Sequence, residues 1–187
     1  MKNVIKIAVV FFFTSAVLWR CGSDAEYDVP AQDTTFRDFL RDIQSSYEPT
    51  LATQYGLYKV TNYESFDEIT AERGDTVSID YSGFTFNKSR QTTFGMEYIF
   101  TTNIPRDTFG TGWVENELFP LKPFTFILGT GQTLRGIDLG LENSAQGDSV
   151  RLYLTSDLAY GGNTIGLIKP GTPVVFKVIL NEVRKKR

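Results

Sequence analysis

The sequence has no histidine, a single cysteine and no phosphate-binding loop, and each absence removes a class of chemistry. Without histidine, no Ser–His or Cys–His nucleophile can be assembled, and zinc loses its commonest ligand. The lone Cys21 cannot form an internal disulfide. Gly129-Thr130-Gly131 lacks the following Lys-Ser/Thr of a nucleotide loop and is typical of a turn before a helix. We therefore expect no metal and no cofactor, and hydrolases and nucleotide enzymes fit poorly.

The composition describes an ordinary globular chain. Hydrophobic residues make up 41 % of its 187 residues and charged residues 22 %, enough for one domain of usual size plus a short extension. The formal net charge is −3, and the one basic run is residues 184–187. Because no basic stripe is present, we expect no nucleic-acid partner.

Residues 1–20 have the pattern of an export signal. Lys2 and Lys6 supply positive charge, and an apolar run follows that is too short to span a bilayer comfortably, which favours a signal peptide. Cys21 comes next and resembles the lipidated cysteine of bacterial lipoproteins, although Arg20 stands where that pattern usually has a small residue. We expect a lipid-anchored protein of the bacterial cell envelope, on the periplasmic or surface side of the outer membrane. The alternative is an ordinary cleaved signal or an uncleaved anchor, with Cys21 incidental.

Residues 21–55 are predicted to be a tether followed by a helix. The stretch 22–33 is polar and acidic, as tethers are, and Thr34 or Thr35 is predicted to cap the helix. Apolar residues then recur at helical spacing, at Phe36, Phe39, Leu40 and Ile43. We expect this face to pack against the main domain, with dimerisation as the alternative; the oligomeric state is not predicted.

Residues 56–187 are predicted to be one α+β domain, because apolar residues alternate with period two around a single helical pattern. The expected strands are 57–60, 76–84, 95–100, 124–128, 150–154 and 174–183, and the expected helix is 133–142. The stretch 101–121 holds two prolines and two glycines and is interpreted as a loop insertion. It either closes over a ligand or packs against the domain.

Five motifs carry a family resemblance. They are Pro123–Gly129, Gly136-Ile137-Asp138, Ser156–Gly161 (Ser-Asp-Leu-Ala-Tyr-Gly), Ile165–Pro170 and Pro173–Leu180. In this order they resemble the FKBP-type peptidyl-prolyl isomerases over roughly residues 56–183. Phe100-Thr101-Thr102-Asn103-Ile104 is similar to a stretch of Bacteroidetes FKBP-like lipoproteins. The resemblance implies a half-open antiparallel β-barrel wrapped around one short helix, with the N-terminal helix as an extension.

The same resemblance assigns pocket residues. The catalytic group would be Tyr81, Phe100, Tyr160 and Phe176, and the substrate-binding group would be Phe124, Thr133, Leu134, Ile137, Leu167 and Ile168. By the same resemblance, the Tyr160 hydroxyl would donate to a bound carbonyl and Phe176 would form the back wall. Each residue taken alone is better explained by core packing, and only the ordered set favours a pocket.

Individual roles follow within this set. The Leu134 amide would bind the ligand, Ile137 would form the floor, and Leu167 and Ile168 would line the rim. Phe126 would point into the core.

Two carboxylates are interpreted as structural. Asp157 would brace the loop before Tyr160, and Asp138 is either a brace or solvated. An acid–base role for Asp157 is the weaker interpretation.

Two positions depart from the family pattern. Ile137 stands where the family usually has tryptophan, which predicts a shallower pocket. Thr101 stands where an aspartate usually lies beside the pocket phenylalanine, and a hydroxyl cannot supply the charge of that carboxylate.

The chemistry implied needs no nucleophile. Rotation about an X-Pro bond faces a barrier of ~18–20 kcal/mol because it removes amide resonance, and an apolar pocket with one or two donors can bind the twisted state preferentially. We expect a peptidyl-prolyl isomerase without cofactor, acting on proline-containing unfolded or envelope proteins and held to the membrane by its N-terminal lipid. A catalytically weak binding or chaperone module is the alternative, and an accessory subunit of a larger envelope machine is a third possibility.

Overall fold

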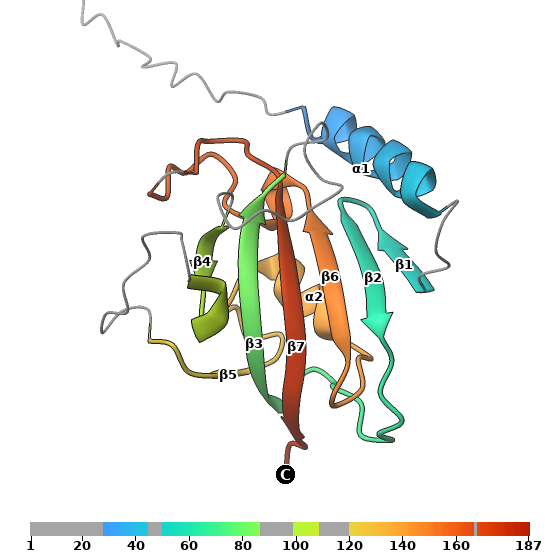
Figure 1. Cartoon of the computed structure of the whole chain (residues 1–187), viewed down its shortest axis with the longest axis vertical. Coiled ribbons are helices and arrows are strands. Elements are labelled where there is room, and N and C mark those ends of the chain that lie inside the picture. The colour runs from blue at the N-terminus through green and yellow to red at the C-terminus, as the bar shows by residue number, and fades with distance from the viewer. Residues whose placement is uncertain (1–27, 45–49, 87–98, 109–119, 167) are drawn as a thin grey trace, which may run out of the picture.

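The structure, a computed structural model, describes residues 28–44, 50–86, 99–108, 120–166 and 168–187 (Figure 1). Its helices are α1 (Val29–Gln44) and α2 (Arg135–Leu141), with short 3-10 turns η3 (Pro105–Thr108) and η4 (Ser156–Leu158). Its strands are β1 (Thr50–Gln54), β2 (Leu57–Tyr63), β3 (Thr76–Thr85), β4 (Ile99–Thr102), β5 (Phe124–Ile127), β6 (Ser149–Leu154) and β7 (Val174–Arg184). The predicted α+β class and antiparallel sheet are confirmed.

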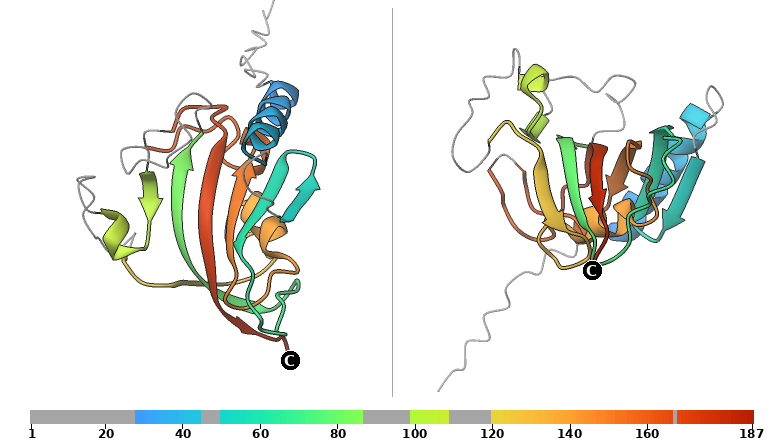
Figure 2. Two further views of the ribbon diagram at one scale, coloured as in Figure 1. Left: turned by 45° about the vertical axis from the view of Figure 1, so that its right-hand side comes forward. Right: turned by 90° about the horizontal axis from the view of Figure 1, so that it is seen from below.

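The described strands form one curved antiparallel sheet in the order β1-β2-β6-β7-β3-β4 (Figure 2). β7 pairs with β3 along its whole length, and β4 and β5 pair in succession with the other edge of β3. β5 takes the first half of that edge, from Thr76 to Ile79, and β4 the second half, from Ser82 to Phe84. Between them lies Tyr81, so the sheet opens beside this side chain.

α2 packs on the inner face of the sheet, behind it in Figure 1. Strand alternation brings Leu152 and Leu154 of β6 to this face, where they meet α2. The helix can lie this close because Gly136 and Gly140 face those leucines: a Cβ at Gly136 would sit 2.4 Å from Leu154 Cδ2, and one at Gly140 2.6 Å from Leu152 Cδ2. The main core is therefore built between α2 and the sheet.

α1 packs on the outer face and creates a second core. Phe36, Phe39 and Leu40 of α1 are buried against residues that alternate away from the main core, namely Tyr58, Val60, Tyr153 and Val175. The Phe36 ring lies 6.1 Å from Tyr58, 5.7 Å from Tyr153 and 4.6 Å from Phe86, all in edge-to-face geometry. The apolar face of α1 is thus used within the chain, as the packing prediction states.

The predicted start of this helix was wrong. α1 begins at Val29, because the Asp28 carboxylate caps it by accepting the Ala31 N–H at 2.9 Å, and Pro30 sits in the first turn where a missing N–H costs nothing. Thr34 and Thr35 lie inside the helix. Their hydroxyls donate to carbonyls one turn back, at 2.9 Å and 2.7 Å.

Two strands also differ from the prediction. β1 was not predicted, and Thr101 and Thr102, placed in the loop insertion, belong to β4. Residues 109–119 of that insertion lie outside the described residues, as do the signal, Cys21 and residues 95–98 of the predicted third strand. No helix in the described parts of the chain is long and apolar enough to cross a membrane.

Candidate functional site

A pocket of about 350 Å³ opens on the inner side of the sheet where β4 and β5 part. Its lining residues are Ile79, Tyr81, Thr101, Phe124, Gln132, Thr133, Leu134, Ile137, Tyr160 and Phe176. Seven of the ten predicted site residues are among them. Ile79 and Gln132 were not predicted; the alternation that puts Ile79 on the same face as Tyr81 was a usable signal for the first.

The walls are aromatic rings in contact with one another. The Tyr81 ring lies 6.4 Å from Phe124 and 6.2 Å from Phe176, centroid to centroid. Phe100, predicted as catalytic, is not a lining residue but stands directly behind the wall, 5.7 Å from Phe176 and 5.9 Å from Tyr160. Five rings predicted from distant parts of the sequence therefore form one connected cluster.

A β-bulge brings Phe100 and Thr101 to the same side of β4. Gly83 pairs with Thr101 and Phe84 with Ile99, so Phe100 is the extra residue in the ladder. Both side chains converge on Gly83, where an added Cβ would lie 2.8 Å from Phe100, Phe176 and Thr101 alike. Thr101 thereby lines the pocket. A hydroxyl therefore stands in the pocket wall where the family pattern has a carboxylate.

Asn103 holds the opening between β4 and β5. Its side chain accepts the Tyr81 N–H at 2.7 Å and donates to the carbonyls of Ile79 at 3.0 Å and Lys122 at 2.9 Å. The residue is 3 % exposed, so these bonds are protected from water. An amide side chain thus takes the place of a strand neighbour for Tyr81, a role that the sequence alone did not indicate.

Tyr160 supplies a hydrogen-bond donor at the pocket. Burial, together with the nearby Tyr81, raises the pKa of its phenol to about 12, so the hydroxyl keeps its proton. Among the described residues, no hydrogen-bond partner is found for this hydroxyl. A ligand carbonyl in the pocket can therefore accept from it.

Two further donors flank the opening. Leu134 precedes α2 in extended conformation, and its N–H meets no acceptor within the described parts of the chain. Gln132 uses its side-chain oxygen to accept the Ile127 N–H at 2.8 Å, and its amide nitrogen has no acceptor among the residues that the structure describes. The rim can thus bind the carbonyl groups of an extended peptide.

The predicted braces occupy the expected positions. The Asp138 carboxylate, 6 % exposed, accepts the N–H groups of Gly129 at 3.0 Å and Gly131 at 3.1 Å and so fixes the turn before α2. Asp157 accepts the Thr155 hydroxyl at 2.5 Å at the start of the segment that leads to Tyr160. Neither carboxylate lines the pocket, and the described residues contain no cluster suited to a metal ion.

Of the two residues predicted at the rim, Ile168 is not found there. Ile168 is 1 % exposed and does not line the pocket, because paired backbone hydrogen bonds with Ile165 close a tight turn that directs it inward. Leu167 lies outside the described residues.

Comparison with known proteins identifies the family of this chain. A family model described as FKBP-type peptidyl-prolyl cis-trans isomerase matches residues 110–181. An FK506-binding protein of Neisseria meningitidis serogroup B is 34 % identical over 80 residues, which cover 39 % of this chain and 73 % of that protein. The chain belongs to the FKBP-type peptidyl-prolyl cis-trans isomerase family, as the motifs predicted.

Other relatives are much larger. FK506-binding protein 5 of Dictyostelium discoideum is 29 % identical over 113 residues, which cover 60 % of this chain and 6 % of that protein. FK506-binding protein 4 of Neurospora crassa is 37 % identical over 62 residues, 33 % of this chain and 13 % of the relative. Against these relatives the chain spans only a small part of the full length.

Proposed function

We propose that this protein is a peptidyl-prolyl cis-trans isomerase acting on X-Pro bonds without a cofactor. The observation that carries the proposal is the pocket lining. It joins aromatic walls to the Tyr160 hydroxyl, which has no hydrogen-bond partner among the described residues, and no Asp, Glu, Lys or Arg side chain is among the described lining residues. Such a site suits a reaction in which a bond rotates and no proton or group is transferred.

The proposed chemistry follows from these contacts. The pyrrolidine ring packs among Tyr81, Phe124 and Phe176 above the Ile137 floor, which removes water from the rotating amide. Tyr160 donates to a substrate carbonyl, and the Leu134 amide is placed to bind the chain that follows. Catalysis arises where these contacts are better in the twisted state than in either planar isomer.

The test uses a substrate protein whose refolding is limited by proline isomerisation, a step that takes tens to hundreds of seconds uncatalysed. We expect a catalytic amount of the full-length protein to speed the slow phase without changing its amplitude. An unchanged slow phase in the presence of demonstrably folded protein would contradict the proposal.

A second candidate is a binding or chaperone module with little turnover, and Thr101 favours it. This side chain lines the pocket where the family pattern has a carboxylate, so the pocket lacks that charge. In the refolding test such a module would bind unfolded chains and leave the rate of the slow, proline-limited phase unaltered. Thr101→Asp separates the candidates further: restored charge raises turnover if the missing carboxylate limits the rate.

We further propose that the substrates are exported or envelope proteins and that Cys21 carries a lipid anchor. The support is the N-terminal pattern of the sequence, a charged start and an apolar run followed by a lone cysteine. In a bacterial host, Cys21→Ser should move the protein from the membrane fraction to the released fraction. An unchanged distribution between the membrane and released fractions would refute the lipid anchor and would not affect the isomerase proposal.

A further inference from the structure

α1 makes a polar contact with the segment that carries Tyr160. The Gln32 side-chain oxygen accepts the Ser156 N–H at 2.8 Å, and its amide nitrogen donates to the Gly171 carbonyl at 2.9 Å. One partner is a donor and the other an acceptor, so the two bonds fix the orientation of the amide. One side chain thereby binds two segments that lie 124 and 139 positions further along the sequence, at Ser156 and Gly171.

These two contacts close a ring of hydrogen bonds. The Ser156 carbonyl accepts the Gly161 N–H at 2.7 Å, and the Gly161 carbonyl accepts the Gly171 N–H at 2.8 Å. The circuit therefore runs from Gln32 to Ser156, Gly161, Gly171 and back to Gln32. Tyr160 directly precedes Gly161, so the backbone that aims its hydroxyl lies within the ring.

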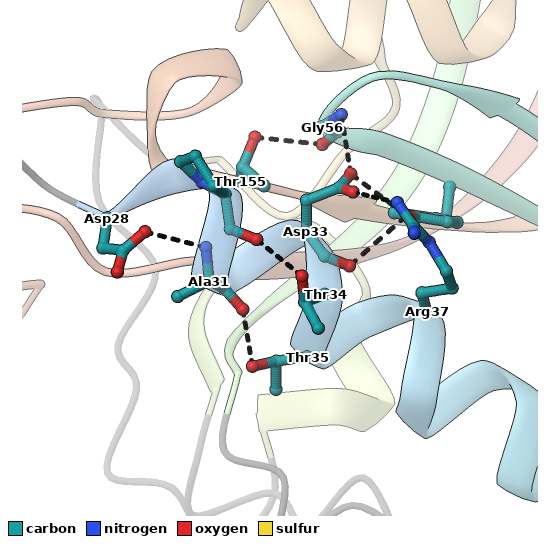
Figure 3. A network of polar contacts seen from close by, with 10 residues as sticks. Asp28, Ala31, Asp33, Thr34, Thr35, Arg37, Gly56 and Thr155 are labelled. Atoms are coloured by element: carbon teal, nitrogen blue, oxygen red, sulfur yellow. Dashed lines mark hydrogen bonds and ion pairs between the residues drawn. The ribbon is translucent and has the colours of Figure 1, made fainter.

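A second anchor lies one residue further along α1. The Asp33 carboxylate, 4 % exposed, accepts the Gly56 N–H at 3.1 Å and the Tyr58 hydroxyl at 3.0 Å. The Gly56 carbonyl in turn accepts the Thr155 N–H at 2.9 Å, and the Thr155 hydroxyl, whose single proton is shared with Asp157, lies 3.1 Å from the same carbonyl (Figure 3). α1 is thus bonded directly to Ser156 and, through Gly56, to Thr155, at the point where the chain leaves β6 for Tyr160.

Apolar packing alone does not fix the position of the Tyr160 segment relative to α1. Phe36, Phe39 and Leu40 hold α1 on the outer face, but burial of apolar surface is non-directional. The Gln32 bonds act at defined atoms. They connect a helix on the outer face with a donor in a pocket on the inner face.

We propose that Gln32 is a positioning residue for Tyr160, acting through the ring it closes with Ser156, Gly161 and Gly171. As a statement about catalysis this rests on the proposed isomerase function. As a statement about the Tyr160 segment it stands on the hydrogen bonds alone. α1 then belongs to the functional unit, beyond its part in the second core.

Amide hydrogen exchange on the full-length protein tests the ring directly. In Gln32→Leu, which keeps an apolar stem and removes both bonds, the amides of Ser156, Gly161 and Gly171 should exchange faster by on the order of tenfold. The amide of Val178 in β7 should be unchanged. Thr34→Ala is the matched control on the same helix, since it removes only a bond within α1. Unchanged protection at Gly161 and Gly171 in Gln32→Leu would overturn the proposal.

Gln32→Glu serves as a second variant should Gln32→Leu fail to fold. It keeps an acceptor for the Ser156 N–H and sets a carboxylate oxygen against the Gly171 carbonyl. Protection should then be lost at Gly171 and kept at Ser156. Equal protection of both amides in this variant and in wild type would contradict the ring.

The kinetic arm is a double-mutant cycle in the isomerase assay. Gln32→Leu should lower kcat/KM several-fold in the wild-type background and cause no further loss in Tyr160→Phe, because the two residues act as one unit. Equal losses in both backgrounds would overturn positioning through Tyr160. A wild type without isomerase activity would refute the proposed function only, and hydrogen exchange would still decide the role of Gln32.

Discussion

At the scale of single residues, Tyr160 is a neutral donor because burial disfavours its phenolate. With the pKa raised from 10.0 to about 12, the hydroxyl still carries its proton at pH values where an ordinary tyrosine is ionised. The proton form that the folded state prefers is the neutral one. Tyr160 therefore contributes stability that is present below pH 10 and is lost as the pH rises towards 12.

This shift can be measured with ¹³C-labelled tyrosine and NMR. We expect one ring signal, absent in Tyr160→Phe, to titrate about two units above an ordinary tyrosine. Titration of that signal near pH 10 would show that the hydroxyl is solvated and that the pocket is wet.

Gly83 is the residue on which the pocket wall depends most. Gly83→Ala places a methyl group 2.8 Å from Phe100, Phe176 and Thr101, so these side chains must shift. We expect the free energy of unfolding to fall by about 1–3 kcal/mol and peptide binding to weaken. Urea unfolding and a peptide titration check this, with the exposed Thr125→Ala as the strand control. Full peptide affinity in Gly83→Ala would contradict the wall described above.

Asp75 links the start of β3 to the end of the chain. Burial by itself would raise the pKa of this carboxyl, but bonds from Lys185 Nζ at 2.7 Å, the Lys186 N–H at 2.9 Å and the Glu72 N–H at 2.8 Å outweigh it and lower the pKa to about 2. A depressed carboxyl pKa gives stability that is present above pH 4 and is lost as the pH falls towards 2.

Asp75→Asn should therefore lower the free energy of unfolding at pH 7 by about 2 kcal/mol. The difference from wild type should shrink as the pH falls from 4 to 2. Urea unfolding at several pH values measures it, and Glu182→Gln, which removes an exposed ion pair, should change little. A difference that stays constant down to pH 2 would refute this assignment.

At the scale of elements, α1 is held on the outer face of the sheet by aromatic packing. Phe36 is fully buried among Tyr58, Phe86 and Tyr153, and Phe36→Ala should cost about 3–5 kcal/mol in urea unfolding. Phe66→Ala is the matched control, because that ring is 98 % exposed and its loss should stay within about 0.5 kcal/mol. Similar small effects for both would mean that α1 is only loosely attached.

Sequence periodicity located most helices and strands, but it missed the start of α1 and the edge strand β1. The alternation in β3 and β7 and the helical spacing in α2 were visible because each buries one face. The start of α1 was missed because both threonines resemble caps, while Asp28 lay in the acidic stretch interpreted as tether. β1 was missed because Thr50–Gln54 offers one large apolar residue and, among the described strands, pairs with β2 alone.

At the scale of the whole molecule, one curved sheet separates two cores, and the pocket lies on the α2 side. The resemblance selected Tyr81, Phe124, Tyr160 and Phe176 from many aromatics, and tertiary folding brings them together. Sequence could not reveal the bulge at Phe100, the bridging amide of Asn103 or the Gln32 ring. Each depends on pairing between segments far apart in the chain.

The central claim is that the Tyr160 pocket turns over X-Pro bonds, and cis–trans exchange of a Leu-Pro peptide followed by NMR tests it most directly. Wild type, Tyr160→Phe and Tyr63→Phe would be compared at equal catalytic concentration; Tyr63 is 58 % exposed and lies outside the pocket lining. We predict accelerated exchange with wild type and Tyr63→Phe, and a rate lower by on the order of five- to tenfold with Tyr160→Phe, the effect of one lost hydrogen bond. No acceleration by folded wild type, or equal rates for all three, would contradict the account.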